Sequence, residues 1–206
     1  MGWIPIGTDN APFIGSFEGN GFKITDLYIS SDLQSVGLFG VNNGDVKNLG
    51  VETAQGSISA SSGSGSNYIG GIAGKNLGTI TNSYSTGKIS ASSSSYIFSS
   101  GAGGIVGENA GTITNSYSIG DVSAFTGVST NGYAYAGGIA GRTDSGIITN
   151  SVAANKNVAA TAENAQASTA HIGRIVAGTL GFFDVSNNFA DSDMLLNENL
   201  AFDSIT

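Results

Sequence analysis

The sequence GIAGKNLGTITNSYSTGKIS at residues 71–90 returns as GIVGENAGTITNSYSIGDVS at residues 104–123, 33 residues further along the chain. Looser copies of the same two blocks flank this pair. The first block reads VGLFG (36–40), IGGIAG (69–74), AGGIVG (102–107), AGGIAG (136–141) and IGRIVA (172–177). The second reads DVKNLGV (45–51), TITNSYS (79–85), TITNSYS (112–118), IITNSVA (147–153) and DVSNNFA (184–190). A period of this length predicts a repeat protein in which each copy is one structural unit.

The content of each copy favours strands over helices. Gly, Ser, Thr and Asn dominate, no apolar pattern of helical period is visible, and short alternating runs lie between glycines. Because side chains two residues apart share a face of a strand, we expect four columns to point inward and the Thr81 and Ser83 positions to point outward. The inward columns are Val46, Ile80, Ile113, Ile148, Val185; Asn48, Asn82, Asn115, Asn150, Asn187; Gly50, Tyr84, Tyr117, Val152, Phe189; and Leu38, Ile72, Ile105, Ile139, Ile175.

Like residues at a fixed period stack most simply in an all-β, right-handed parallel β-helix, a β-solenoid of about six coils spaced about 4.8 Å apart. In this fold the Asn column forms a structural ladder of amide hydrogen bonds from coil to coil. The glycines at 40, 74, 107 and 141, and at 44, 78, 111 and 146, are expected at corners that need positive φ or close approach.

We predict a single domain over residues 1–206. Residues 1–35 form an N-terminal coil, in which Ile24 takes the place of Val46, and residues 36–190 form the repeats. Residues 191–206 break the pattern and form a short C-terminal cap, either irregular or a helix with Asp193 as its N-cap.

Charge and composition exclude several classes of partner. The net charge is -8 with only 7 basic residues, which argues against nucleic acid. No apolar run approaches the length of a membrane span, so we expect no membrane insertion by this segment. The chain has no Cys and 1 His, so we expect no metal site and no cofactor.

The stretches GGIAGKNLGTITNSYSTGKIS and its sister copy resemble the GLUG motif, a repeat of bacterial surface proteins that include adhesins and noncatalytic regions of immunoglobulin A-specific metallopeptidases. The preceding FIGSFEGNGFKITDLYIS (13–30) resembles the flank that leads into such repeats. The resemblance is specific at 69–90 and 102–123, looser at 136–158, and weak at 172–190, where Arg174 and Ala177 replace glycines. It implies an extracellular β-helix within a larger surface protein, and therefore a secreted or cell-surface location.

No catalytic constellation is visible, and we predict that the chain is not an enzyme. His171, the only histidine, lies at or one residue beyond the position of Tyr68 and Tyr135 in the repeats, and we assign it a structural or surface role. No H-E-x-x-H motif occurs, and the acidic residues fall in different columns, whereas a carbohydrate-active enzyme needs acids that converge.

The variable segments 53–67, 90–101, 123–135 and 159–170 carry the candidate ligand-binding residues Tyr96, Phe98, Phe125, Tyr133 and Tyr135. The alternative is that these segments are ordinary strands with core aromatics. We expect an adhesin-type module that binds a host or matrix glycan or protein. Two further alternatives are a β-helix polysaccharide lyase or hydrolase, and an ice-binding face built on Thr79, Thr81, Thr112 and Thr114.

Overall fold

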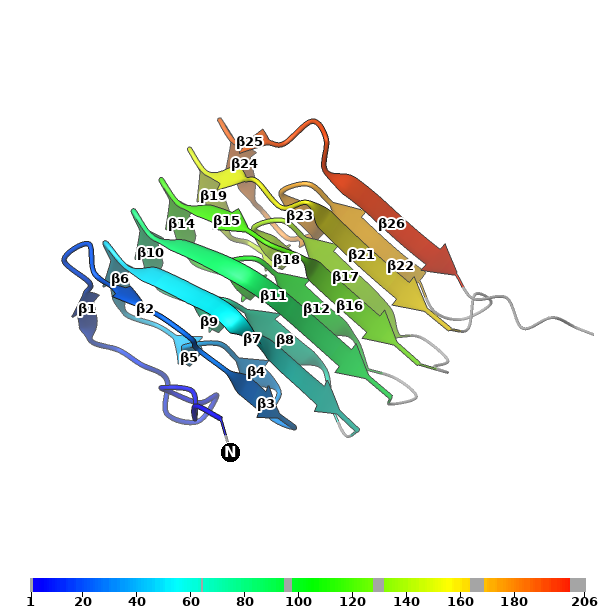
Figure 1. Cartoon of the computed structure of the whole chain (residues 1–206), viewed down its shortest axis with the longest axis horizontal. Coiled ribbons are helices and arrows are strands. Elements are labelled where there is room, and N and C mark those ends of the chain that lie inside the picture. The colour runs from blue at the N-terminus through cyan, green and yellow to red at the C-terminus, as the bar shows by residue number, and fades with distance from the viewer. Residues whose placement is uncertain (1, 64, 95–97, 128–131, 164–168, 201–206) are drawn as a thin grey trace, which may run out of the picture.

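The computed structural model describes residues 2–63, 65–94, 98–127, 132–163 and 169–200, and all regular structure within them is β-strand. Every strand pairing is parallel and joins one copy of the repeat to the next, as Ile80 of one copy pairs with Ile113 of the following copy. In Figure 1 the coils follow one another from the blue N-terminal strands to the red strand at the opposite end. The predicted parallel β-solenoid is confirmed.

Four sheets make up the sides of the stack. Sheet A comprises β5 (Phe39–Asn42), β9 (Ala73–Asn76), β13 (Val106–Asn109), β18 (Ala140–Asp144) and β23 (Val176–Leu180). Sheet B comprises β1 (Ser16–Glu18), β6 (Asp45–Lys47), β10 (Thr79–Thr81), β14 (Thr112–Thr114), β19 (Ile147–Thr149) and β24 (Asp184–Ser186). Sheet D comprises β4 (Ser35–Val36), β8 (Asn67–Gly70), β12 (Ser100–Gly103), β17 (Tyr133–Gly137) and β22 (Thr169–Gly173).

Sheet C is the largest and contains two strands from most coils. Its strands are β2 (Lys23–Ile24), β3 (Ile29–Ser31), β7 (Gly50–Ser62), β11 (Tyr84–Ser93), β15 (Tyr117–Ile119), β16 (Val122–Thr126), β20 (Val152–Ala153), β21 (Asn157–Ala162), β25 (Phe189–Ala190) and β26 (Leu195–Leu200). Each full coil therefore runs through sheets D, A, B and C in turn.

The predicted number of about six coils is too high. Sheet B has six strands, but sheets A and D have five each, because the N-terminal residues supply named strands only to sheets B and C. The expected short N-terminal coil is present, in a different register. Phe17 pairs with Val46, whereas Ile24 pairs with Val51.

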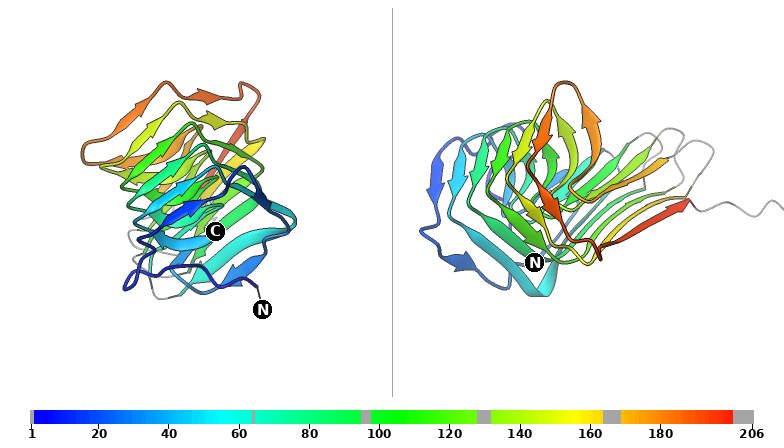
Figure 2. Two further views of the ribbon diagram at one scale, coloured as in Figure 1. Left: turned by 90° about the vertical axis from the view of Figure 1, so that its left-hand side faces the viewer. Right: turned by 90° about the horizontal axis from the view of Figure 1, so that it is seen from above.

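Two of the predicted inward columns form the core. The Val46 and Leu38 columns are buried at every coil except the last, where Ile175 and Val185 pack against the core but are only partly buried. Sheets C and D pack face to face as an arm, which Figure 2 shows extending from the rest of the stack. Buried alanines line much of this arm, and their small side chains allow the two sheets to approach closely: Ala60, Ala91, Ala102, Ala124, Ala134, Ala136, Ala160, Ala162, Ala170.

The other two predicted columns point outward, which corrects the expectation. Asn82 and its equivalents Asn115, Asn150 and Asn187 are exposed and adopt the left-handed conformation with φ near 50°. One left-handed residue turns the chain at the corner between sheets B and C and reverses the alternation that follows it. As a result Tyr117, Val152 and Phe189 are exposed, and the serines expected outside, such as Ser83, are buried.

The inner ladder of asparagines lies elsewhere, at Asn42, Asn76 and Asn109 in sheet A. All three side chains are buried, with 2.8 Å from Asn42 Nδ2 to Asn76 Oδ1 and 2.9 Å from Asn76 Nδ2 to Asn109 Oδ1. At the predicted column, the amide bonds run only from Asn82 to Asn48 at 3.3 Å and from Asn48 to Glu18 at 2.9 Å. Thr143 continues the inner ladder by donating to the Asn109 carbonyl.

The C-terminal segment does not form the helix that we considered. Asp193 lies in a turn, and the apolar residues after it form β26, which adds to sheet C beside β21. Residues 201–206 of the predicted cap lie outside the described part of the chain. No helix within the described residues is long and apolar enough to cross a membrane.

Candidate functional site

The candidate site lies at the junction where the outer face of sheet D meets sheet A, which we call the groove. Glycines make this junction tight: a Cβ atom on Gly74 would lie 2.3 Å from Val36 N in β4, and one on Gly107 would lie 2.3 Å from Ile69 N in β8. Neither glycine has positive φ, so of the two predicted reasons for these glycines, close approach is the one that applies. The groove follows the stacking direction across the coils, with sheet D as one wall and sheet A as the other.

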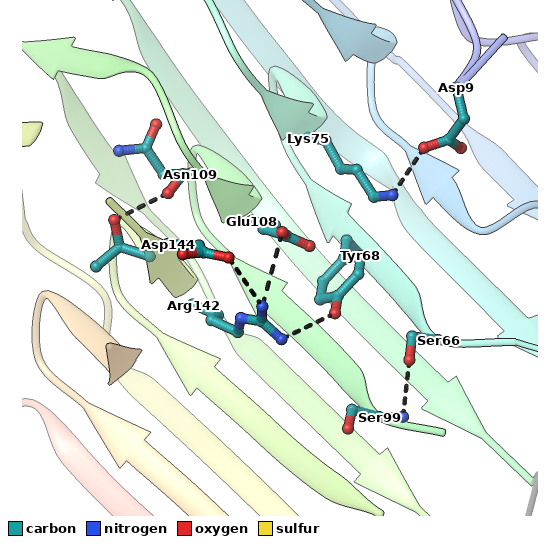
Figure 3. A network of polar contacts seen from close by, with 10 residues as sticks. Asp9, Ser66, Tyr68, Lys75, Ser99, Glu108, Asn109, Arg142 and Asp144 are labelled. Carbon is teal, nitrogen blue, oxygen red and sulfur yellow. Dashed lines mark hydrogen bonds and ion pairs between the residues drawn. The ribbon is translucent and has the colours of Figure 1, made fainter. Parts of the chain in front are cut away.

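A column of charged residues from sheet A lines the groove. Lys75, Glu108 and Arg142 occupy the same position in successive coils. Arg142 Nη2 lies 3.9 Å from Glu108 Oε1 and 3.4 Å from Asp144 Oδ2, as Figure 3 shows. At the N-terminal end, Lys75 Nζ lies 2.7 Å from Asp9 Oδ1.

Tyr68 of β8 connects the two walls. Its hydroxyl accepts a hydrogen bond of 3.3 Å from Arg142 Nη1, and the Lys75 ammonium lies 5.4 Å from the ring centroid (Figure 3). Burial, and after it the Glu108 carboxylate, raise the pKa of Tyr68 to about 12. For Arg142, burial opposes the charge, but Tyr68 and Glu108 outweigh it and its pKa is raised. Tyr68 therefore stays neutral and holds the charged column against sheet D.

At the last two coils the sheet D wall is aromatic. Tyr135 pairs with His171 in the adjacent strand, and their rings are nearly parallel, with centroids 5.1 Å apart. Tyr133 lies 5.7 Å from Tyr135 and 5.8 Å from His171, so the three rings form one continuous surface. A hollow of about 280 Å³ opens beside them, bounded by Tyr135, Arg142, His171 and residues 177–180.

This arrangement can bind a ligand with both apolar and hydroxyl groups, because rings line one side and hydrogen-bonding groups line the other. The carboxylates of Glu108 and Asp144 both pair with the Arg142 guanidinium. Within the described residues, no group of three or more His, Asp or Glu side chains is placed to hold a metal ion.

The predicted ligand-binding aromatics do not form one site. Tyr133 and Tyr135 lie together in the groove, with Tyr133 40% exposed. Phe125 is half-buried on the outer face of sheet C, and Phe98 is half-buried just before β12. Tyr96 lies outside the described residues. The described parts of the variable segments contribute strands to sheets C and D, as the alternative interpretation had it, but Tyr133 is not a core aromatic.

The charged wall of the groove was not predicted from the sequence. Lys75, Glu108 and Arg142 each follow the last residue of the first repeat block, directly after Gly74, Gly107 and Gly141. That shared position was the available signal. The position that Tyr68, Tyr135 and His171 share was predicted in the same way, and the pairing of Tyr135 with His171 confirms it for these two residues.

A second hollow, of about 290 Å³, lies at the corner between sheets B and C near the N-terminus. Tyr84 forms one side of it, stacked on Tyr117 with centroids 4.8 Å apart, and its hydroxyl donates to Glu52 at 2.9 Å. Hydrogen bonds from Lys23 and then Tyr84 lower the pKa of Glu52. Because this surface also combines aromatic rings with carboxylates, it is the natural comparison for the groove.

Residues 65–90 and 98–123 both match the family described as the GLUG motif. This chain carries two GLUG motifs. The predicted resemblance is thereby confirmed for the two near-identical copies. In the groove, the GLUG repeats contribute Tyr68, Lys75 and Glu108, together with the glycines that bring sheets A and D together.

Two known proteins are similar to the chain. A protein of Evansella cellulosilytica, provisionally named a Gly-rich membrane protein, is 36% identical over 88 residues, which is 39% of this chain and 9% of that protein. The chain thus spans less than a tenth of this relative. A crystal structure from Bacteroides ovatus, provisionally named an immunoglobulin A1 protease, superposes on 99% of this chain and 68% of its own with a TM-score of 0.50 at 22% identity. At that identity the likeness supports the fold alone.

Proposed function

We propose that this GLUG β-solenoid is a noncatalytic, adhesin-type module of a secreted or cell-surface bacterial protein, and that it binds glycans in the groove between sheets A and D. The single observation that carries the proposal is the stacked pair of rings of Tyr135 and His171 facing Arg142 across a hollow of about 280 Å³. Sugar rings present C–H faces to aromatic side chains and hydroxyls to charged ones, so both walls are used.

A relative supports the surface location. The Evansella cellulosilytica protein, 36% identical over 88 residues, is named as a membrane protein. A rigid parallel stack suits a module that holds a binding groove away from its attachment point.

The test is a glycan array probed with the purified chain, followed by calorimetric titration of the glycans that bind. Tyr133→Ala should weaken binding roughly tenfold, or about 1.4 kcal/mol, because it removes the ring that packs against Tyr135 and His171 and supports this wall of the hollow. Tyr117→Ala is the matched control: Tyr117 is 39% exposed, close to the 40% of Tyr133, but lies on the other face. It should bind as the unaltered chain does.

Three results would contradict the proposal. An array without glycan binding, with binding only to matrix proteins on a parallel array, would favour a protein partner. Loss of binding in Tyr117→Ala but not in Tyr133→Ala would move the site to the Tyr84 surface. New reducing ends or unsaturated products after incubation with polysaccharides would make the chain an enzyme.

A further inference from the structure

The groove is filled by the protein's own side chains along most of its length. Asp9 lies at its N-terminal end, where Ser35 Oγ donates to its carboxylate at 3.2 Å and Lys75 pairs with it. Next come Tyr68, 6% exposed, and then Arg142, which bonds to the Tyr68 hydroxyl. Tyr68 and Arg142 therefore close the groove on the N-terminal side of the hollow.

The groove opens at one coil because the charged column ends in a glycine. Gly178 pairs with Arg142 and follows Lys75, Glu108 and Arg142 in the column. A Cβ atom on Gly178 would lie 2.5 Å from Tyr135 Cε1, so the Tyr135 ring lies over Gly178 where a side chain would otherwise stand. The hollow lies beside this ring, and Arg142 bounds it on the N-terminal side.

The charges around the hollow disfavour an acidic ligand. Arg142 is the positive group at the boundary, and it already pairs with both Glu108 and Asp144. A third carboxylate would add repulsion from two negative groups, in a protein whose net charge is -8. A neutral sugar hydroxyl brings no such repulsion and can still donate to or accept from the polar groups at the boundary.

The size of the hollow limits the ligand to about one sugar unit. Ligand pockets for drug-sized molecules span about 300–1,000 Å³, and the hollow, at about 280 Å³, lies just below that range. We infer that the groove takes the terminal unit of a neutral glycan, which rests against Tyr135 and His171 and ends at Arg142, rather than an internal stretch of an extended chain. This inference rests on the proposed function and specifies its ligand.

The experiment is a calorimetric titration of the intact chain with neutral oligosaccharides of increasing length that share one terminal unit, taken from the array. The affinity should change less than about twofold as the oligosaccharide lengthens, since only its terminal unit enters the hollow. The corresponding glycan with a terminal uronic or sialic acid should bind at least tenfold more weakly. Affinity that rises steadily with length, or stronger binding of the acidic glycan, would overturn the inference.

A matched pair of glycine variants tests the same point from the protein side. Gly178→Ala should weaken binding at least tenfold, because the added methyl group would collide with the Tyr135 ring and displace it from the wall of the hollow. Gly63→Ala is the control, since a Cβ there meets its nearest atom only at 4.0 Å. Unchanged binding in Gly178→Ala, with both variants folded by circular dichroism, would overturn the inference while leaving glycan binding intact. Absence of binding to every glycan would instead contradict the proposed function.

Discussion

At the residue scale, asparagine has two different tasks in this chain. Asn82 and its equivalents take a left-handed conformation at an exposed corner, which asparagine tolerates better than most residues. Asn42, Asn76 and Asn109 instead bury their amides and pass hydrogen bonds from coil to coil. Both sets of asparagines recur at a fixed position in successive copies of the repeat. This recurrence alone does not indicate which set is buried.

The distinction predicts different costs of substitution. Asn76→Ala should lower the free energy of unfolding by about 3 kcal/mol, because it leaves Asn42 Nδ2 and Asn109 Oδ1 without their partner inside the core. Asn82→Ala should cost only about 1 kcal/mol, the penalty of placing alanine in the left-handed region. Urea unfolding of both variants measures the difference. Equal losses would mean that the buried ladder adds no stability beyond the corner.

The same residues explain which expectations failed. Period-two alternation predicted the Ile80 column correctly, because Thr79–Thr81 is a regular strand. It failed from Asn82 onward, because this left-handed residue is itself exposed and reverses the faces after it, so that Ser83 is buried in place of Tyr84. A rule that treats each Asn of the TITNSYS phrase as a corner would have placed both correctly.

At the element scale, the groove is a contact between two sheets that are joined by Tyr68. The hydroxyl group of Tyr68 lies on sheet D and bonds to Arg142 on sheet A. The groove itself could not be predicted from the repeat columns, because it depends on how sharply sheet A turns from sheet D. That turn is set by glycines whose spacing is visible in the sequence but whose close contacts are not.

This contact predicts a loss of stability in alkali. The pKa of Tyr68 is raised to about 12 in the folded chain against 10.0 for a free tyrosine, so its contribution is fully present below pH 10 and is lost as the pH rises toward 12. The expected loss is roughly 2 to 3 kcal/mol. Tyr68→Phe should be less stable than the unaltered chain at neutral pH, since Arg142 loses an acceptor, but should show a flatter decline between pH 10 and 12.

Urea midpoints below pH 10 and near pH 12 measure the slope for both proteins. Tyr84→Phe is the comparison, because the pKa of Tyr84 is also raised to about 12, by burial and then Glu52, at a more exposed place where solvent screens the effect. A Tyr68→Phe slope as steep as that of the unaltered chain would show that Tyr68 is not the group responsible.

At the scale of the whole molecule, the coils stack into a solenoid with one side that differs from the others. The outer faces of sheets B and C follow from the sequence of each coil separately. Sheets A and D instead enclose a groove that involves residues of several coils. The solenoid fold follows from the period and content of the repeat. The groove is open at Gly178, because this glycine adds no charged side chain to the column of Lys75, Glu108 and Arg142. The interruption becomes visible only when the strand pairing has aligned the coils.

The most direct test is a crystal structure of the chain with a bound neutral oligosaccharide from the array. The account predicts one terminal sugar ring against Tyr135 and His171, within hydrogen-bonding distance of Arg142, and no sugar between Arg142 and Asp9. A sugar bound on the Tyr84 and Tyr117 surface, or a glycan that continues past Arg142 along the groove, would contradict it.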